Sequence, residues 1–413
     1  MAIRKRKWTT SDGDAREAWV FDYVDQAGKR RLKTFDRRRD AEQYAANTKV
    51  QLSKGTHVPD SASITVREAG ELWLNRCRAD GLEQGTIDQY EQHLRLHICP
   101  YIGTVKLSQL TVPYVSEFRD RLSNGNSALP DDDTRRLARS HAMVRGVMGS
   151  LSSLLADAHV RGRVAYNAVR ALPRMKRKDR HKPKLVIGVD IPTPDEVRRL
   201  IDAAEGKWRP FLMTAVFTGL RASELRGLRW DDVDLSAALL HVRQRADKYN
   251  VIGSPKSRSG KRTIPLPPAT VRELREWKLA CPKKDGRLAL VFPNGAGNTE
   301  NYVNIAKRGL EPTMLAAGIT RPVLDKHGVG MRDEAGRPIV QPKYTGLHTL
   351  RHFFASWCIN RKEDGGRGLP GKVVQELLGH SSITMTMDTY GHLFPRGDDA
   401  AEMAAAERLL LSR

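Results

Sequence analysis

The chain has 413 residues, with 70 Lys or Arg against 48 Asp or Glu, and its formal net charge is +22. A chain of this length is longer than one hydrophobic core ordinarily supports, and we therefore expect two or three domains. The charge favours a polyanionic partner, most simply nucleic acid, over a basic surface that only keeps the protein soluble.

The sequence also excludes several classes of protein. Its basic first 14 residues are not followed by an apolar core, so we expect no secretory signal. No stretch approaches 18 consecutive apolar residues, so we expect no membrane span. The four cysteines show no C-x-x-C spacing, which argues against a disulfide framework or a zinc site. These features predict a cytoplasmic protein.

Residues 1–60 predict a small β-rich unit. The segments AWVFDYVD and KRRLKTF alternate apolar and polar residues around a turn at 25–28, which predicts a hairpin. Residues 36–52 then predict a helix that ends at Gly55. A three-stranded sheet with a helix and this much basic charge could lay strands in a DNA groove. A basic dimerisation module is the alternative.

Residues 63–172 predict a helical bundle. Thr65 to Glu68 and Thr86 to Gln89 each have the pattern of a capping box at a helix start. A third amphipathic stretch stops at Asn124-Gly125, and a long fourth segment runs from about Thr134 to His159.

Residues 173–188 predict a basic linker, because seven of the eleven residues 174–184 are Lys or Arg and prolines flank them. The linker could follow a phosphate backbone or serve only as a solvated tether. The last domain, 189–413, begins with a helix start at Thr193 and is mainly helical, with LLHVR and RTIPL as a small sheet. The predicted fold class is therefore mainly α with small β-sheets (α+β).

Three local patterns in the last domain carry candidate chemistry. In FTGLRASELRGLRW, Arg221 follows a helix break and can be aimed by rigid neighbours, although a surface pair with Glu224 is the alternative. In LHTLRHFFASW, His348 and Arg351 share one helix face. His352 lies four residues after His348, as in H-E-x-x-H, but no glutamate follows His348, which disfavours a metal site.

The third pattern is LGHSSITMTMDTYGHLF, in which Tyr390 lies ten residues after His380. Two arginines can bind the non-bridging oxygens of a phosphodiester and neutralise the charge that develops on phosphorus. A tyrosine hydroxyl can then attack phosphorus and form a phosphotyrosyl ester. This chemistry requires neither a metal nor ATP, so we expect no cofactor.

Together these patterns resemble the tyrosine recombinase (phage integrase) family, whose motif pieces look like TGLR-x-SEL, H-x-LRH and LGHSS…T…Y. The resemblance implies an arm-type DNA-binding domain at 1–60, a core-binding (SAM-like) DNA-binding domain at 63–172 and a catalytic domain at 189–413. It also asks for a lysine on a β-hairpin. Lys256 fits that pattern best among three candidates, with Lys261 as the fallback and Lys248 third.

The predicted catalytic residues are Arg221, Lys256, His348, Arg351, His380 and Tyr390. The two arginines are expected to clamp the scissile phosphate, while Tyr390 attacks it to give a 3′-phosphotyrosyl link. Lys256 is expected to protonate the leaving 5′ oxygen, and His348 to handle the proton of the nucleophile. His380 is expected to donate a hydrogen bond to the phosphate. His352 is interpreted as structural, packed behind Arg351.

The predicted function is site-specific recombination that integrates or excises a phage or mobile element. The expected partners are double-stranded DNA at attachment sites, three further copies in a homotetramer, and a directionality factor or DNA-bending host protein. A type IB topoisomerase and a non-catalytic DNA-binding protein are the alternatives. Segments 320–345 and 361–371 are expected to be surface loops. A final helix, tipped with three leucines, is expected to dock on the next protomer or to pack within its own chain.

Overall fold

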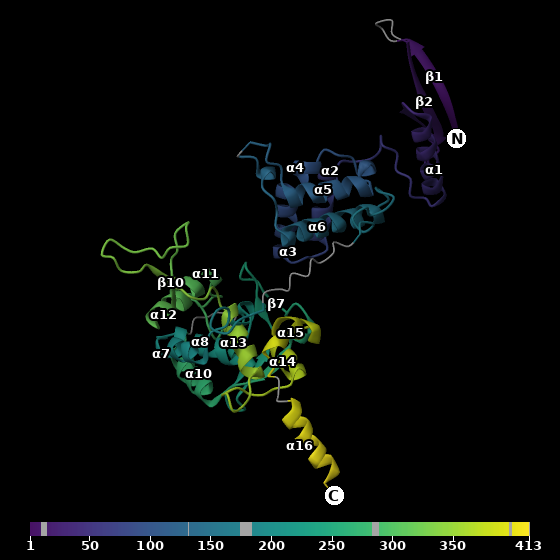
Figure 1. Cartoon of the computed structure of the whole chain (residues 1–413). Helices are drawn as coiled ribbons and strands as arrows, with labels where there is room; N and C mark the ends of the chain where they lie inside the picture. Colours follow the sequence, from purple (N-terminus) through teal and green to yellow (C-terminus); the bar gives the residue numbers. More distant parts are fainter. Residues whose placement is uncertain (10–14, 131, 174–183, 283–288, 396–398, 413) are drawn as a thin grey trace. The chain divides into compact units, whose positions relative to one another are not determined.

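The computed structural model describes residues 1–9, 15–130, 132–173, 184–282, 289–395 and 399–412. The chain divides into two compact units, Met1–Arg177 and Lys178–Arg413 (Figure 1). The fold is mainly α with small sheets, which confirms the predicted class. Most of the predicted linker, residues 174–183, lies outside the described residues. None of the described helices is long and apolar enough to cross a membrane.

The first unit begins with a three-stranded antiparallel sheet. Its strands are β1 (Ala2–Thr9), β2 (Ala15–Val24) and β3 (Arg30–Phe35), in the order β1-β2-β3, followed by α1 (Arg38–Ser53). The predicted hairpin is confirmed as β2–β3. In its turn the Asp25 carboxylate accepts hydrogen bonds from the backbone N–H groups of Ala27 and Lys29, and Gly28 adopts a φ of +74°.

The rest of this unit is a helical bundle. Its helices are α2 (Val66–Ala79), α3 (Gln84–His93), α4 (Cys99–Ile102), α5 (Val112–Asn124) and α6 (His141–Val160). A π-helical segment, Leu94–Ile98, joins α3 to α4. The capping box at Thr65 is confirmed, and α5 ends at Asn124 as predicted, with Gly125 at a φ of +67°.

Two predicted helix starts in the bundle are wrong. The helix α3 already begins at Gln84, so Thr86 lies inside its first turn and cannot cap it. The fourth helix begins at His141 rather than Thr134. Asp133 accepts a hydrogen bond from a backbone N–H there and starts only a short 3₁₀ turn, and the Ser140 side chain caps the real helix.

The second unit contains most of the helices. Their bounds are α7 (Pro194–Asp202), α8 (Trp208–Thr218), α9 (Ala222–Arg226), α10 (Pro268–Ala280), α11 (Tyr302–Asn304), α12 (Glu311–Ala316), α13 (His348–Ile359), α14 (Gly371–Leu378), α15 (Ile383–Tyr390) and α16 (Asp399–Leu411). The helix α7 starts after Thr193 as predicted, and Thr193 caps it through a capping box with Glu196. The small predicted sheet is also present. It has the order β4-β5-β8, with β4 (Val233–Asp234), β5 (Leu239–Val242) and β8 (Arg262–Pro265), beside a separate pair β6 (Arg245–Ala246) and β7 (Ile252–Gly253).

Helices α8 and α13 pack closely against each other in this unit. Gly219 ends α8 in the left-handed conformation, with a φ of +59°. A Cβ on Gly219 would lie 2.3 Å from Cδ1 of Phe354 on α13, so the close approach requires glycine. Arg221 follows two residues after Gly219, just past this junction.

Three segments of the second unit bear on the surface loops and the final helix expected from the sequence. Segment 320–345 is more ordered than a loop, since β9 (Thr320–Pro322) and β10 (Val340–Pro342) pair antiparallel in it. Segment 361–371 has turns but no strand, and it enters α14 only at its last residue, as a surface loop should. The three leucines that end α16, residues 409–411, are each at least 70% exposed, so they do not pack within the chain in this structure.

Candidate active site

The C-terminal end of α14 gathers three arginines that are far apart in sequence. The donor–acceptor pairs are Arg262 Nε to Leu377 O at 2.7 Å, Arg351 Nη2 to Leu378 O at 2.5 Å and Arg221 Nη2 to Gly379 O at 3.2 Å. The last carbonyls of a helix lack intrahelical partners and carry partial negative charge. One helix end therefore orients three guanidinium groups through three consecutive carbonyls.

Arg351 is the most deeply buried of these arginines, with 2% of its surface exposed. Its Nη1 also donates a hydrogen bond to the carbonyl of Gly219 at 2.7 Å. Burial lowers the pKa of Arg351 to about 9, and the nearby cations of Arg221 and Arg262 act in the same direction. The side chain is therefore still cationic at neutral pH, and it is held rigidly from two sides.

Glu224 links Arg221 to Arg262. Its carboxylate lies 2.8 Å from Nη1 of Arg221 and 2.9 Å from Nη2 of Arg262, and the residue is only 3% exposed. The pairing of Arg221 with Glu224 is real, but the surface pair considered as an alternative is wrong, because the carboxylate is buried and shared. Neither the shared carboxylate of Glu224 nor the pairing of Arg262 with it was predicted from the sequence.

We expect Glu224→Gln to destabilise the protein in a pH-dependent way. Burial alone would raise the pKa of Glu224, but the charges and hydrogen bonds of Arg262 and Arg221 lower it to about 2. A carboxylate with a lowered folded-state pKa stabilises the fold above its unfolded-state pKa and loses that contribution as pH falls toward 2. The difference between this folded-state pKa and the usual pKa of glutamate corresponds to a contribution of about 3 kcal/mol to folding stability at neutral pH.

Calorimetry at pH 7 and pH 3 measures this effect as the gap in Tm between wild type and Glu224→Gln. The gap should be large at pH 7 and smaller at pH 3. Glu273→Gln is the matched control, because Glu273 pairs with one arginine, Arg209, and is more exposed. A gap that is equal at both pH values would contradict the assigned role of Glu224.

The segment before β8 lies against the same helix end. Gly379 has a φ of +64°, and a Cβ there would lie 2.9 Å from both Ser259 O and Arg262 Nη1. Lys256 stands three residues before Ser259, with an exposed side chain. Of the other lysine candidates, Lys248 lies in the β6–β7 turn and Lys261 directly precedes β8.

Tyr390 is the last residue of α15, and its hydroxyl is directed inward. The residue is 1% exposed, and its Oη lies 2.7 Å from Nδ1 of His352. Its ring is nearly parallel to that of His380, with centroids 6.4 Å apart. His352 was interpreted as packing behind Arg351, and the structure adds a contact between its ring nitrogen and the hydroxyl of the candidate nucleophile. The spacing of His352 from His348 was the signal available in the sequence, and it was weighed only for metal binding.

Burial raises the pKa of the Tyr390 hydroxyl to about 12, although the cations of Arg351 and Arg221 oppose this increase. The hydroxyl is thus protonated at neutral pH and needs a partner that accepts its proton before it can attack. It is also covered, so either α15 or the residues that cover the hydroxyl must move before a phosphate can reach it.

His380 is held by Thr386. Its Nδ1 lies 2.9 Å from the buried Thr386 hydroxyl, and burial together with the arginine cations lowers its pKa to about 4. The imidazole is therefore neutral at pH 7. If the hydroxyl donates to Nδ1, the ring proton is on Nε2, which is then a hydrogen-bond donor.

His348 occupies the more open position on α13. Its side chain is exposed, while partial burial and the cations of Arg351 and Arg221 lower its pKa. Its ring meets that of His352 edge-on, with centroids 4.6 Å apart. The structure thus brings together five of the six predicted residues, Arg221, His348, Arg351, His380 and Tyr390, and places Lys256 on the neighbouring segment.

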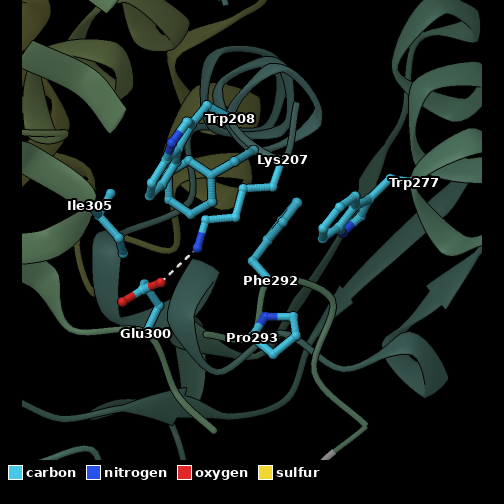
Figure 2. Close-up of a pocket in the computed structure, with 8 residues that line it drawn as sticks. Lys207, Trp208, Trp277, Phe292, Pro293, Glu300 and Ile305 are labelled. Atoms are coloured by element: carbon cyan, nitrogen blue, oxygen red, sulfur yellow. Dashed lines mark hydrogen bonds and ion pairs between the residues drawn. The ribbon is translucent and has the colours of Figure 1, made fainter. Parts of the chain in front are cut away.

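Among the described residues of this unit, neither metal ligation nor the pocket beside Lys207 offers a competing reaction site. Among the described residues, no group of three or more His, Cys, Asp or Glu side chains is placed to hold a metal ion. Figure 2 shows a pocket lined by aromatic residues in which Lys207 Nζ lies 2.7 Å from Glu300 Oε2. Its volume is about 10 Å³, enough for one water molecule. It lies at the start of α8, about 16 Å along the helix axis from Gly219.

Comparison with known proteins gives consistent matches. Residues 192–396 match the family described as the phage integrase family, and residues 65–123 match its N-terminal SAM-like domain. A tyrosine recombinase XerC-like protein of Caldanaerobacter subterraneus is 27% identical over 227 residues, which are 52% of this chain and 53% of that protein. The prophage integrase IntR of Escherichia coli K12 is 24% identical over 351 residues, 83% of this chain and 79% of that protein. The chain thus spans about half of the first relative and four fifths of the second.

A similar fold occurs in solved structures. The Tn1549 transposon integrase in complex with transposon right end DNA superposes with a TM-score of 0.57 at 20% identity, over 84% of this chain and 100% of that chain. At this identity the likeness establishes the fold alone.

Proposed function

Because this chain belongs to the phage integrase family, we propose that it is a site-specific DNA recombinase of a phage or mobile element. It cleaves and rejoins DNA strands through a 3′-phosphotyrosyl intermediate, without a metal or ATP. The observation that carries this proposal is the meeting of Arg221, Arg351 and the Tyr390 hydroxyl with neutral histidines around the end of α14.

The proposed chemistry assigns a task to each group. Arg221 and Arg351 bind the non-bridging oxygens of the scissile phosphate and stabilise the charge that builds up during the displacement. Tyr390 attacks phosphorus, and the 5′ oxygen leaves with a proton from Lys256, which lies on an exposed segment that can follow the substrate. His380 donates a hydrogen bond to the phosphate through Nε2. One of the two neutral histidines on α13, His348 or His352, takes the proton of Tyr390.

The proposed partner is double-stranded DNA, and we place the reaction in the cytoplasm, where attachment sites are accessible. Charge supports the choice of DNA. The unit at the N-terminus presents exposed arginines on α1 and β3, and the whole chain carries +22. Each phosphate that the protein neutralises releases counterions, so binding must weaken as salt concentration rises.

We therefore expect affinity for a random-sequence duplex of about 40 bp to fall roughly 100-fold or more between about 50 and 200 mM salt. Fluorescence anisotropy at several salt concentrations gives the slope directly. An affinity that does not change over this range would contradict the electrostatic basis of the proposed DNA binding.

We also propose that four copies assemble on paired DNA sites, with a directionality factor or a DNA-bending host protein as accessory. The exposed leucines at the end of α16 support contact with a neighbouring copy. Three adjacent leucines that are at least 70% exposed leave an apolar patch in contact with water, and such patches commonly mark protein interfaces. A chain that ends at Gly397 should still bind DNA but should lose recombination. If the truncated chain recombined at the wild-type rate, α16 would have no role in assembly.

A single plasmid experiment tests the proposed function. Supercoiled plasmids that carry the DNA flanking this gene are incubated with the protein in EDTA, and the reaction is quenched with detergent. We expect protein covalently attached to DNA, and recombinant products when two sites are present. Relaxation without recombinants would favour a type IB topoisomerase, and DNA binding without any adduct would favour a non-catalytic DNA-binding protein.

A further inference from the structure

The contact between His352 and Tyr390 joins the attacking oxygen to a possible proton acceptor. The two atoms, Nδ1 and Oη, lie 2.7 Å apart, which is hydrogen-bond distance and close enough for direct proton transfer. Tyr390 is 1% exposed and His352 is half-buried, so bulk water has little access to the pair. A water molecule is therefore a poor substitute for the imidazole at this position.

The protonation state of His352 suits this task. Burial is the main cause that lowers the pKa of His352 to about 4, and the charges of His348 and Arg351 on the same helix lower it further. Asp190, before α7, raises it. The imidazole is thus neutral at pH 7, and its Nδ1 lone pair can accept the phenol hydrogen when the ring proton is on Nε2.

The neighbouring His348 is placed for a different task. Its side chain is exposed, and the cations of Arg351 and Arg221 lie close enough to lower its pKa, so a phosphate bound by these arginines would lie near His348. His352 points inward from the next turn of α13 and contacts the hydroxyl itself. Arg351 and His352 are adjacent, so one rigid helix carries both the phosphate clamp and the proton acceptor.

We propose that His352, rather than His348, holds the Tyr390 hydroxyl and takes its proton during strand cleavage. This inference rests on the proposed function. In the step, a lone pair of Tyr390 Oη forms the bond to phosphorus as the hydroxyl proton moves to His352 Nδ1. The bond from phosphorus to O5′ breaks, and O5′ takes a proton from Lys256. During rejoining, the imidazolium of His352 returns its proton to the departing tyrosine.

Two substitutions at position 352 distinguish a hydrogen bond to the Tyr390 hydroxyl from acceptance of its proton. His352→Phe removes both, whereas the amide oxygen of His352→Asn can accept the hydrogen bond but cannot take a proton. We expect the single-turnover cleavage rate on the plasmid substrate to fall about 100-fold or more in both variants, with DNA affinity unchanged. His241→Asn is the matched control, since His241 bonds to Thr263 on the small sheet.

The pH profile adds a readout that a merely structural role would not change. Wild-type cleavage should be nearly flat between pH 6 and 8, because His352 is already neutral and Arg351, whose pKa is about 9, is still mostly cationic in that range. Both variants should accelerate by up to about tenfold per pH unit, because they depend on hydroxide or on the small fraction of phenolate. A flat profile and wild-type rate in His352→Phe would overturn the inference. Full activity in His352→Asn would limit His352 to holding the hydroxyl.

A measurement without DNA keeps the inference separate from the proposed function. With 3-fluorotyrosine at position 390, the fluorine resonance should shift when His352→Phe is introduced and stay in place with His241→Asn. An unmoved resonance in His352→Phe would show that the contact does not exist in solution. If the wild-type protein formed no DNA adduct at all, the proposed function would fail, and the fluorine resonance would still decide the contact.

Discussion

Tyr390→Phe should abolish the covalent protein–DNA adduct, with cleavage reduced about 10⁴-fold or more, because removal of a nucleophile leaves no other group to form the intermediate. DNA binding should stay near the wild-type level. The ring of Tyr390 packs in a buried cluster, and phenylalanine keeps all of that apolar surface. The measurement is gel mobility of detergent-quenched plasmid reactions in EDTA.

Tyr344→Phe provides the matched control for this prediction. Tyr344 is also buried, and its hydroxyl donates a hydrogen bond to Glu196 at 2.7 Å, so its loss tests the general cost of removing a buried phenol hydroxyl. Adduct formation should persist in that variant. An adduct that persisted in Tyr390→Phe instead would mean that another side chain is the nucleophile.

Arg351→Lys should reduce cleavage about 100- to 1,000-fold while DNA affinity changes little. The guanidinium donates to the carbonyls of Gly219 and Leu378 at once, and of its five N–H donors these two bonds use only two. A lysine ammonium is a compact point charge on a flexible stem and cannot reproduce this fork. Because affinity comes mainly from many phosphate contacts, the loss should appear in the cleavage rate rather than in Kd.

Arg209→Lys is the control for Arg351→Lys. Arg209 lies in the same unit and donates both to a carboxylate, that of Glu273, and to the backbone carbonyl of Ile201. It should cost some stability and leave cleavage near the wild-type rate. An equal loss in both variants, with a matching drop in Tm, would mean that Arg351 acts only through folding.

Local sequence signals were sufficient for much of the fold. Capping boxes at Thr65 and Thr193 marked real helix starts because the cap side chain and the glutamate three residues later satisfy each other locally. The same pattern at Thr86 failed, because the chain had already turned into a helix at Gln84. Local chemistry names the residues that can cap a helix, but neighbouring backbone decides which of them does.

The sequence by itself determined the candidate set, because the chemistry of Arg221, Arg351, His380 and Tyr390 is intrinsic to their side chains and their motifs are contiguous. Only the tertiary structure decided how these groups are held. The carbonyls at the end of α14 orient the arginines, and Glu224 joins Arg221 to Arg262, which lies 38 residues beyond Glu224 in the sequence. The same is true of His352, whose contact with Tyr390 spans 38 residues. Such partners depend on which buried groups meet when helices pack, and spacing along the chain does not record that.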